Sequence, residues 1–105
     1  MIATGSYDVR SFAIDEEAEM VRLDAQVDLF WPQEAALYRR LGLTGGMTVL
    51  DCGCGTGRLL ARLHEEFPGI RSFGIDVDGG LIELAARRAA QSGLTDFAFS
   101  MQSIT

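Results

Sequence analysis

Apolar residues in the first part of the chain recur at helical spacing. Three or four positions separate successive members of the set Ala18, Val21, Ala25 and Leu29. Asp15 is a suitable N-cap in front of them, and Pro32 suits the first turn of a further helix. We therefore predict one helix over roughly 15–30 and a second from Pro32 to Gly42. Phe30 and Trp31, between the two, are expected to pack both helices against the body of the protein.

From residue 47 onwards the pattern changes to short apolar runs separated by helical segments. The run Met47–Cys52 lacks polar alternation, which is typical of a buried parallel strand. Ile70–Ile75 and Phe97–Met101 are predicted as the second and third strands. Apolar helix faces containing Leu59 and Leu81 lie between them. The order strand, helix, strand, helix, strand predicts an α/β fold with a parallel sheet.

These patterns predict one incomplete domain in three segments. Residues 1–14 form a polar arm, residues 15–46 a helical cover and residues 47–105 a βαβαβ unit.

Net charge and cysteine content limit the partners and the location. The 105 residues carry a formal charge of −6 and no basic run, which disfavours nucleic acids and anionic membrane surfaces as partners. Cys52 and Cys54 are too close for a favourable disulfide, and with His64 they cannot complete a zinc site. We expect two buried thiols, no metal and a cytoplasmic location, with His64 facing solvent.

A glycine-rich turn joins the first predicted strand to the helix that follows it. The spacing of Gly53, Gly55 and Gly57 is G-x-G-x-G, and Arg58 stands where a dinucleotide site would continue its pattern. Asp51 precedes the turn, and its carboxylate would repel a pyrophosphate but can pair with an ammonium group. Both features favour an amino-acid-bearing nucleoside over NAD.

A second acidic residue follows the second predicted strand. Asp76 lies about 20 residues beyond the glycine turn, where a carboxylate can accept both ribose hydroxyls. Either class of ligand needs this group, so Asp76 supports a nucleoside ligand but does not distinguish NAD from an amino-acid-bearing nucleoside. Asp78 fits the N-cap of the next helix better than Asp76 does.

The run VLDCGCGTGRLL followed by GIDVD resembles the class I S-adenosylmethionine-dependent methyltransferases. The segments 19–26 and 42–46 are similar to the N-terminal helical cover of members that act on small molecules. The resemblance covers residues 15–105. It implies S-adenosylmethionine as the cofactor, a small-molecule methyl acceptor, and a Rossmann-like, partly parallel sheet in which these three strands have the order 3-2-1.

The resemblance also implies a role for each position that matches the family's motifs. The methionine end of the cofactor is expected to be lined by Asp51, Gly53, Cys54, Gly55 and Gly57. Asp76 is expected to hold the ribose and Val77 to pack on the adenine. Ser103 stands where the family often has an acidic residue near the adenine amino group, which departs from the pattern. No catalytic residue is assigned.

Three of the family's seven strands are present, so the resemblance implies that the chain lacks the acceptor half. The first strand would then have an open edge carrying Val49 and Leu50, which could pair with a second copy of the chain. Two alternatives stay open: part of an NAD-type oxidoreductase, and a non-catalytic interaction module that keeps the fold.

Overall fold

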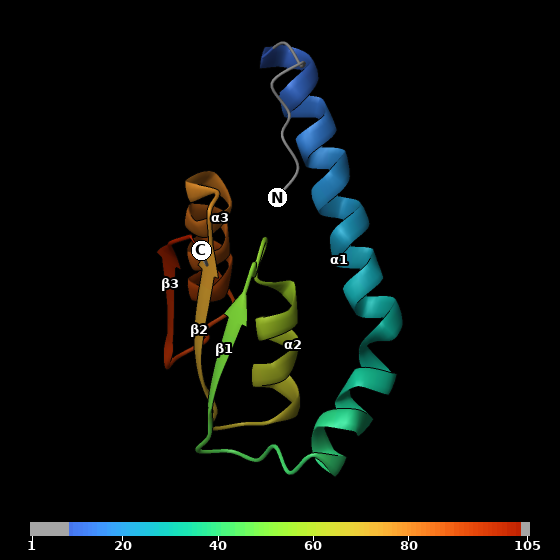
Figure 1. Cartoon of the computed structure of the whole chain (residues 1–105), viewed down its shortest axis with the longest axis vertical. Helices are drawn as coiled ribbons and strands as arrows, with labels where there is room; N and C mark the ends of the chain where they lie inside the picture. The colour runs from blue at the N-terminus through green and yellow to red at the C-terminus, as the bar shows by residue number, and fades with distance from the viewer. Residues whose placement is uncertain (1–8, 104–105) are drawn as a thin grey trace.

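The computed structural model of the chain describes residues 9–103, with side chains from residue 17 onwards. A long helix precedes an alternation of three strands and two helices (Figure 1). The elements are α1 (Val9–Arg40), β1 (Thr48–Cys52), α2 (Arg58–Glu66), β2 (Arg71–Asp76), α3 (Gly79–Gln91) and β3 (Phe97–Met101). The strand, helix, strand, helix, strand order predicted from residue 47 onwards is confirmed.

The three strands form one parallel sheet in the order β1-β2-β3. Asp51 of β1 is in register with Gly74 of β2, which is in register with Phe99 of β3. This order is the one that the family resemblance implied. Within the described residues, β1 and β3 are the edge strands, and β1 pairs with β2 alone.

The N-terminal region is one continuous helix, which corrects the prediction of two. Pro32 lies inside α1, although a proline removes a helical hydrogen bond and strains the preceding turn. The helix continues because Trp31 and Ala35, on either side of it, are 6% and 2% exposed and pack in the core. The helix starts at Val9, within the predicted arm 1–14, and residues 1–8 lie outside the described residues.

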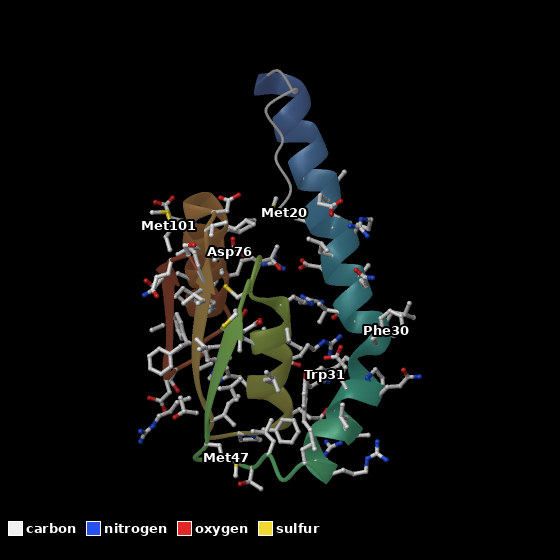
Figure 2. The ribbon with its side chains drawn as sticks, viewed as in Figure 1. Met20, Phe30, Trp31, Met47, Asp76 and Met101 are labelled. Carbon is white, nitrogen blue, oxygen red and sulfur yellow. The ribbon has the colours of Figure 1, made fainter. Side chains whose placement is uncertain are left out.

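The hydrophobic core lies between the sheet and its helices. Leu60 and Leu63 of α2 and Ile70, directly before β2, are almost fully buried, and Trp31 of α1 packs against the same cluster. In Figure 2 Trp31 points towards α2. Burying a leucine of this kind contributes about 2 kcal/mol. This core fixes where α2 begins, and therefore where the glycine turn before it lies.

The other face of the sheet is open among the described residues. Leu50 and Phe73 are neighbours in register on β1 and β2, and they are 58% and 48% exposed. No helix of the described residues is both long enough and apolar enough to cross a membrane.

Several expectations for single side chains are corrected. Cys54 is buried as expected, but Cys52 is exposed because it lies on the open face of the sheet. Phe30 is 46% exposed and points away from the body of the protein (Figure 2), so Trp31 alone of that pair packs in the core. His64 is half-buried, with its Nε2 atom 2.8 Å from the hydroxyl of Ser72, rather than turned to solvent.

Candidate functional site

The candidate site lies at the carboxyl end of the parallel sheet. The glycine turn follows β1 directly, and Asp76 is the last residue of β2. Figure 2 shows Asp76 at this end and Met47, which precedes β1, at the opposite end. Ligands of open α/β sheets bind at the carboxyl ends of strands, so these residues occupy the position at which this architecture places a ligand.

The three glycines of the turn have left-handed backbone angles. The φ angles of Gly53, Gly55 and Gly57 are 79°, 54° and 79°, which side chains with a Cβ rarely adopt. A Cβ at Gly53 or Gly55 would meet nothing within 4 Å, so the backbone there faces open space. A Cβ at Gly57 would lie 3.1 Å from Ala85. The first two glycines therefore leave room for a ligand, and Gly57 allows α2 to pack against α3.

Hydrogen bonds from the turn to β2 fix its position. The backbone N–H groups of Gly53 and Cys54 both donate to the carbonyl oxygen of Ile75, at 2.7 and 2.9 Å. The Gly55 N–H donates to the Oδ2 atom of Asp76 at 3.0 Å, and the N–H of Asp78 donates to Oδ1 at 2.9 Å. The Asp76 carboxylate is thus held beside the turn by two backbone groups. Each of its oxygens keeps a lone pair for a further donor.

Asp51 brings a second carboxylate to this end of the sheet. It lies half-buried near the end of β1, and burial raises the pKa of its carboxyl group. The negative charges of Asp76 and Glu34 raise that pKa further. No lysine or arginine forms an ion pair with Asp51 among the residues that the structure describes. An anionic group in this setting favours a cationic ligand group.

The remaining predicted site residues are Cys54, Val77 and Ser103. Cys54 is buried, and burial followed by the charges of Asp51 and Asp76 raises the pKa of its thiol to about 11. Its thiol is therefore uncharged at neutral pH and a poor nucleophile. Val77 is 45% exposed directly after Asp76. Ser103 is exposed two residues beyond the end of β3.

The helix N-cap expected after the second strand is confirmed. The side chain of Asp78 accepts hydrogen bonds from the backbone N–H groups of Gly80 and Leu81, at the start of α3. The Asp76 carboxylate therefore does not cap α3, and it bonds the backbone of the glycine turn instead.

The sequence patterns did not identify a contact between the turn and α1, made by Thr56 and Asp24. Thr56, within the turn, donates its hydroxyl hydrogen to Asp24 of α1 at 2.6 Å. Asp24 and Asp28 are one helical turn apart, as are Arg58 and Arg62 of α2, and this complementary spacing is the signal that was available. The contact spans 32 residues, so no local pattern shows that the two segments meet.

A separate groove of about 390 Å³ follows the outer edge of β1. Its lining is mainly apolar and includes Leu43, Val49, Leu59 and Leu63. Asp51 is the one residue that this groove shares with the predicted cofactor residues. The groove and the carboxylate cluster are therefore neighbouring features that meet at Asp51.

Comparison with known proteins assigns the family. A family model described as a methyltransferase domain matches residues 43–105, more than half of the chain. A malonyl-[acyl-carrier protein] O-methyltransferase of Anoxybacillus flavithermus is 38% identical over 48 residues. That alignment covers 46% of this chain and 18% of the relative, so the chain spans less than a fifth of that protein's length.

Solved structures show the same architecture. A SAM-dependent methyltransferase from Aquifex aeolicus matches with a TM-score of 0.67 and 27% identity, over 82% of this chain and 46% of that one. PKMT2 from Rickettsia typhi, solved in complex with AdoHcy, matches with a TM-score of 0.51 and 32% identity, over 54% of this chain and 11% of that one. The chain therefore belongs to the methyltransferase domain family and has the fold of the N-terminal part of a class I S-adenosylmethionine-dependent methyltransferase.

Proposed function

We propose that the chain binds S-adenosylmethionine at the carboxyl end of its sheet, as the cofactor-binding part of a methyltransferase. The observation that carries the proposal is the convergence of two carboxylates, Asp51 and Asp76, on a glycine turn whose backbone faces open space. The relative from Rickettsia typhi that was solved with AdoHcy supports the same ligand class.

The groups that line the site fit a ligand in which an amino acid is joined to a nucleoside. Asp51 provides an anionic, partly desolvated group for the ligand's ammonium. Gly53 and Gly55 lack the Cβ that would block close approach. Asp76 has acceptor capacity left for ribose hydroxyls after its two backbone bonds. We assign the adenine side of the site to Val77 and Ser103, and the methionine side to the turn from Gly53 to Gly57, including Cys54.

When bound, the cofactor's sulfonium group supplies an electrophilic methyl carbon. The residues of this chain bind and orient that group, and orientation alone can account for a large part of such a reaction's acceleration. We assign no general base to the chain. Asp51 and Asp76 are cofactor-positioning groups in this proposal, and the neutral thiol of Cys54 takes no part in proton transfer.

A small molecule in the cytoplasm is the proposed methyl acceptor. The net charge of −6 disfavours a polyanionic acceptor such as a nucleic acid. The activity of a complete enzyme and the identity of its acceptor depend on more than the segment shared with the relatives, because the chain covers 18% of one curated relative.

Calorimetric titration with S-adenosylhomocysteine tests the cofactor site. We expect Asp76→Asn to weaken binding at least tenfold, about 1.4 kcal/mol, because the amide keeps one acceptor and loses the charge. Asp96→Asn is the matched control, since Asp96 lies before β3 and asparagine tolerates its φ of 58°. Equal affinity of wild type and Asp76→Asn would contradict the proposal.

Parallel titration with NAD distinguishes the alternatives. Binding of NAD without binding of S-adenosylhomocysteine would support a fragment of an oxidoreductase. A folded chain that binds neither ligand would support an interaction module that keeps the fold.

We also propose that the open edge of β1 pairs with a second copy of the chain. Unpaired strand edges flanked by apolar residues promote association, and the groove beside this edge exposes Leu50 and Met47. Leu50→Lys is expected to shift sedimentation towards monomer, whereas Ala98→Lys, on the far edge strand, is not. Sedimentation of the wild type as a monomer at all concentrations tested would exclude this pairing.

A further inference from the structure

The glycine turn is tied to α1 by a hydrogen-bonded chain of three side chains. Thr56 donates to the Oδ1 atom of Asp24 at 2.6 Å, and the Nη2 atom of Arg88 donates to Oδ2 at 2.9 Å. Thr56 is 7% exposed, and the Asp24 side chain is 19% exposed. The carboxylate of Asp24 therefore joins the turn, α1 and α3 in a largely desolvated setting, where a hydrogen bond to a charged group is strong.

Two carboxylates hold adjacent residues of the turn. Asp76 accepts from the backbone of Gly55, and Asp24 accepts from the side chain of Thr56. Thr56 lies between two glycines, so the backbone on either side of it has many accessible conformations. The two hydrogen bonds select one of them, namely the conformation in which Gly55 leaves open space in front of its backbone.

We propose that Asp24 is a positioning residue for the cofactor site. It holds the glycine turn in the conformation that leaves space for a ligand. It also makes that conformation depend on the packing of α1 against the turn and α3. The inference rests on the proposed function, because it assigns to Asp24 an effect on the ligand bound by the turn.

Asp28 shows that this role differs from general anchoring of α1. Asp28 lies one helical turn after Asp24 and accepts from Arg58 at 2.9 and 2.7 Å and from Arg62 at 2.9 Å. Both arginines belong to α2, and the Asp28 carboxylate makes no hydrogen bond to the turn among the described residues. Asp28 therefore anchors the helix, and its replacement provides a matched control.

Coupling of this kind is reciprocal. If the packing of α1 against the turn favours ligand binding, then bound ligand must favour that packing by the same free energy. Ligand should therefore slow amide exchange in the α1 segment around Asp24 as well as in the turn. In Figure 2 Met20, four residues before Asp24, lies towards the end of the molecule to which the strands point, and Asp24 itself bonds Thr56, so this segment of α1 borders the site.

The test combines calorimetry with amide hydrogen exchange on the 105-residue chain. Thr56→Val keeps the buried shape of the side chain and removes the hydroxyl, and we expect it to weaken S-adenosylhomocysteine binding roughly tenfold. Asp24→Ala should weaken binding at least as much. Thr56→Ser, which restores the hydroxyl, should bind within about threefold of wild type. The double variant should bind no more weakly than Asp24→Ala alone, because the two side chains act through one interaction.

Exchange in the ligand-free chain gives an independent readout. Amides of residues 55–57 should exchange faster than in the wild type in Asp24→Ala and Thr56→Val, and more slowly in Asp28→Ala than in either of these variants. Wild-type affinity and exchange in Thr56→Val would overturn the inference, and so would an equal loss of affinity in Asp28→Ala. Failure of the wild type to bind S-adenosylhomocysteine would instead overturn the proposed function, and the exchange rates would still decide whether Asp24 fixes the turn.

Discussion

Asp51 and Asp76 lie at the carboxyl ends of adjacent parallel strands, and burial together with the charge of Asp76 raises the pKa of Asp51. The raised pKa means that the ionised form of Asp51 is less stable in the folded chain than in water. Glu34 adds a third negative charge to the same surroundings. Folding therefore concentrates negative charge at a site where a bound cation would relieve the repulsion, and retaining that charge costs stability in the ligand-free chain.

Asp51→Asn is expected to raise the stability of the ligand-free chain and to weaken ligand binding. Removing the charge relieves both its desolvation and its repulsion from Asp76, so the melting temperature of the ligand-free chain should rise. Binding of S-adenosylhomocysteine should weaken at least tenfold, because the ammonium group loses its anionic partner. Thermal unfolding followed by circular dichroism and calorimetric titration measure the two effects.

Glu83→Gln is the control for Asp51→Asn. It makes the same change in net charge at an exposed position on α3, so melting temperature and affinity should both stay close to wild type. A lower melting temperature in Asp51→Asn would show that the carboxylate stabilises the free chain, contrary to the direction of its pKa shift.

Asp28 makes the attachment of α1 sensitive to acid. Hydrogen bonds from Arg58, followed by those from Arg62, lower the pKa of Asp28 to about 2. A carboxyl group whose pKa is lower in the folded state stabilises the fold at pH values above its ordinary pKa, and this contribution is lost as the pH falls towards about 2. Asp28→Asn should therefore destabilise the chain by about 1 kcal/mol at pH 6.

Melting temperatures measured from pH 7 to pH 2 check this expectation. The difference between wild type and Asp28→Asn should be constant above about pH 5, shrink below about pH 4 and approach zero near pH 2. A difference that is independent of pH would assign the effect to packing rather than to the ion pairs.

The strands and the glycine turn were predictable from the sequence because they depend on local signals. Apolar runs, the spacing of Gly53, Gly55 and Gly57, and the place of Asp76 after the second run are all contained in short segments. Helix α1 was predicted as two helices because Pro32 disfavours a helix interior, whereas burial of Trp31 opposes that local preference.

Contacts between distant segments were beyond the reach of local patterns. The bond from Thr56 to Asp24 depends on how α1 crosses the beginning of α2. The position of His64 depends on which face of α2 meets β2, because Ser72 is 1% exposed and lies beneath that helix. Helical spacing indicates which residues form the apolar face of a helix. A polar residue at the margin of that face can point either into the protein or towards solvent.

His64 is expected to make stability depend on pH near neutrality. Burial lowers its pKa, and the charge of Asp96 opposes this effect in part. Because the unfolded chain takes up the proton at a higher pH than the folded chain, stability should fall as the pH drops below about 6.5. Urea unfolding at pH 7.5 and 5.5 should show a larger loss of stability in wild type than in His64→Gln, whose amide can still bond Ser72. Equal losses in the two proteins would exclude His64 as the source.

Gly74 connects core packing with the shape of the site. A Cβ at this position would lie 2.6 Å from Cδ1 of Phe99 and 2.8 Å from the sulfur of Cys54, and both distances are too short for real contacts. Gly74→Ala should therefore destabilise the chain by about 1–3 kcal/mol. Because Cys54 belongs to the glycine turn, its displacement should also weaken S-adenosylhomocysteine binding.

A second substitution tests whether the crowding acts through Phe99. Phe99→Leu removes the ring atom Cε1, which would lie 2.7 Å from the added methyl group, so the double variant Gly74→Ala/Phe99→Leu should be more stable than the sum of the two single effects predicts. Thermal unfolding of the four proteins gives this coupling, and titration of the same set shows whether affinity recovers with it. If stability recovers and affinity does not, the residual displacement lies at Cys54. Strictly additive effects on stability would show that the methyl group added by Gly74→Ala is accommodated without contacting the ring.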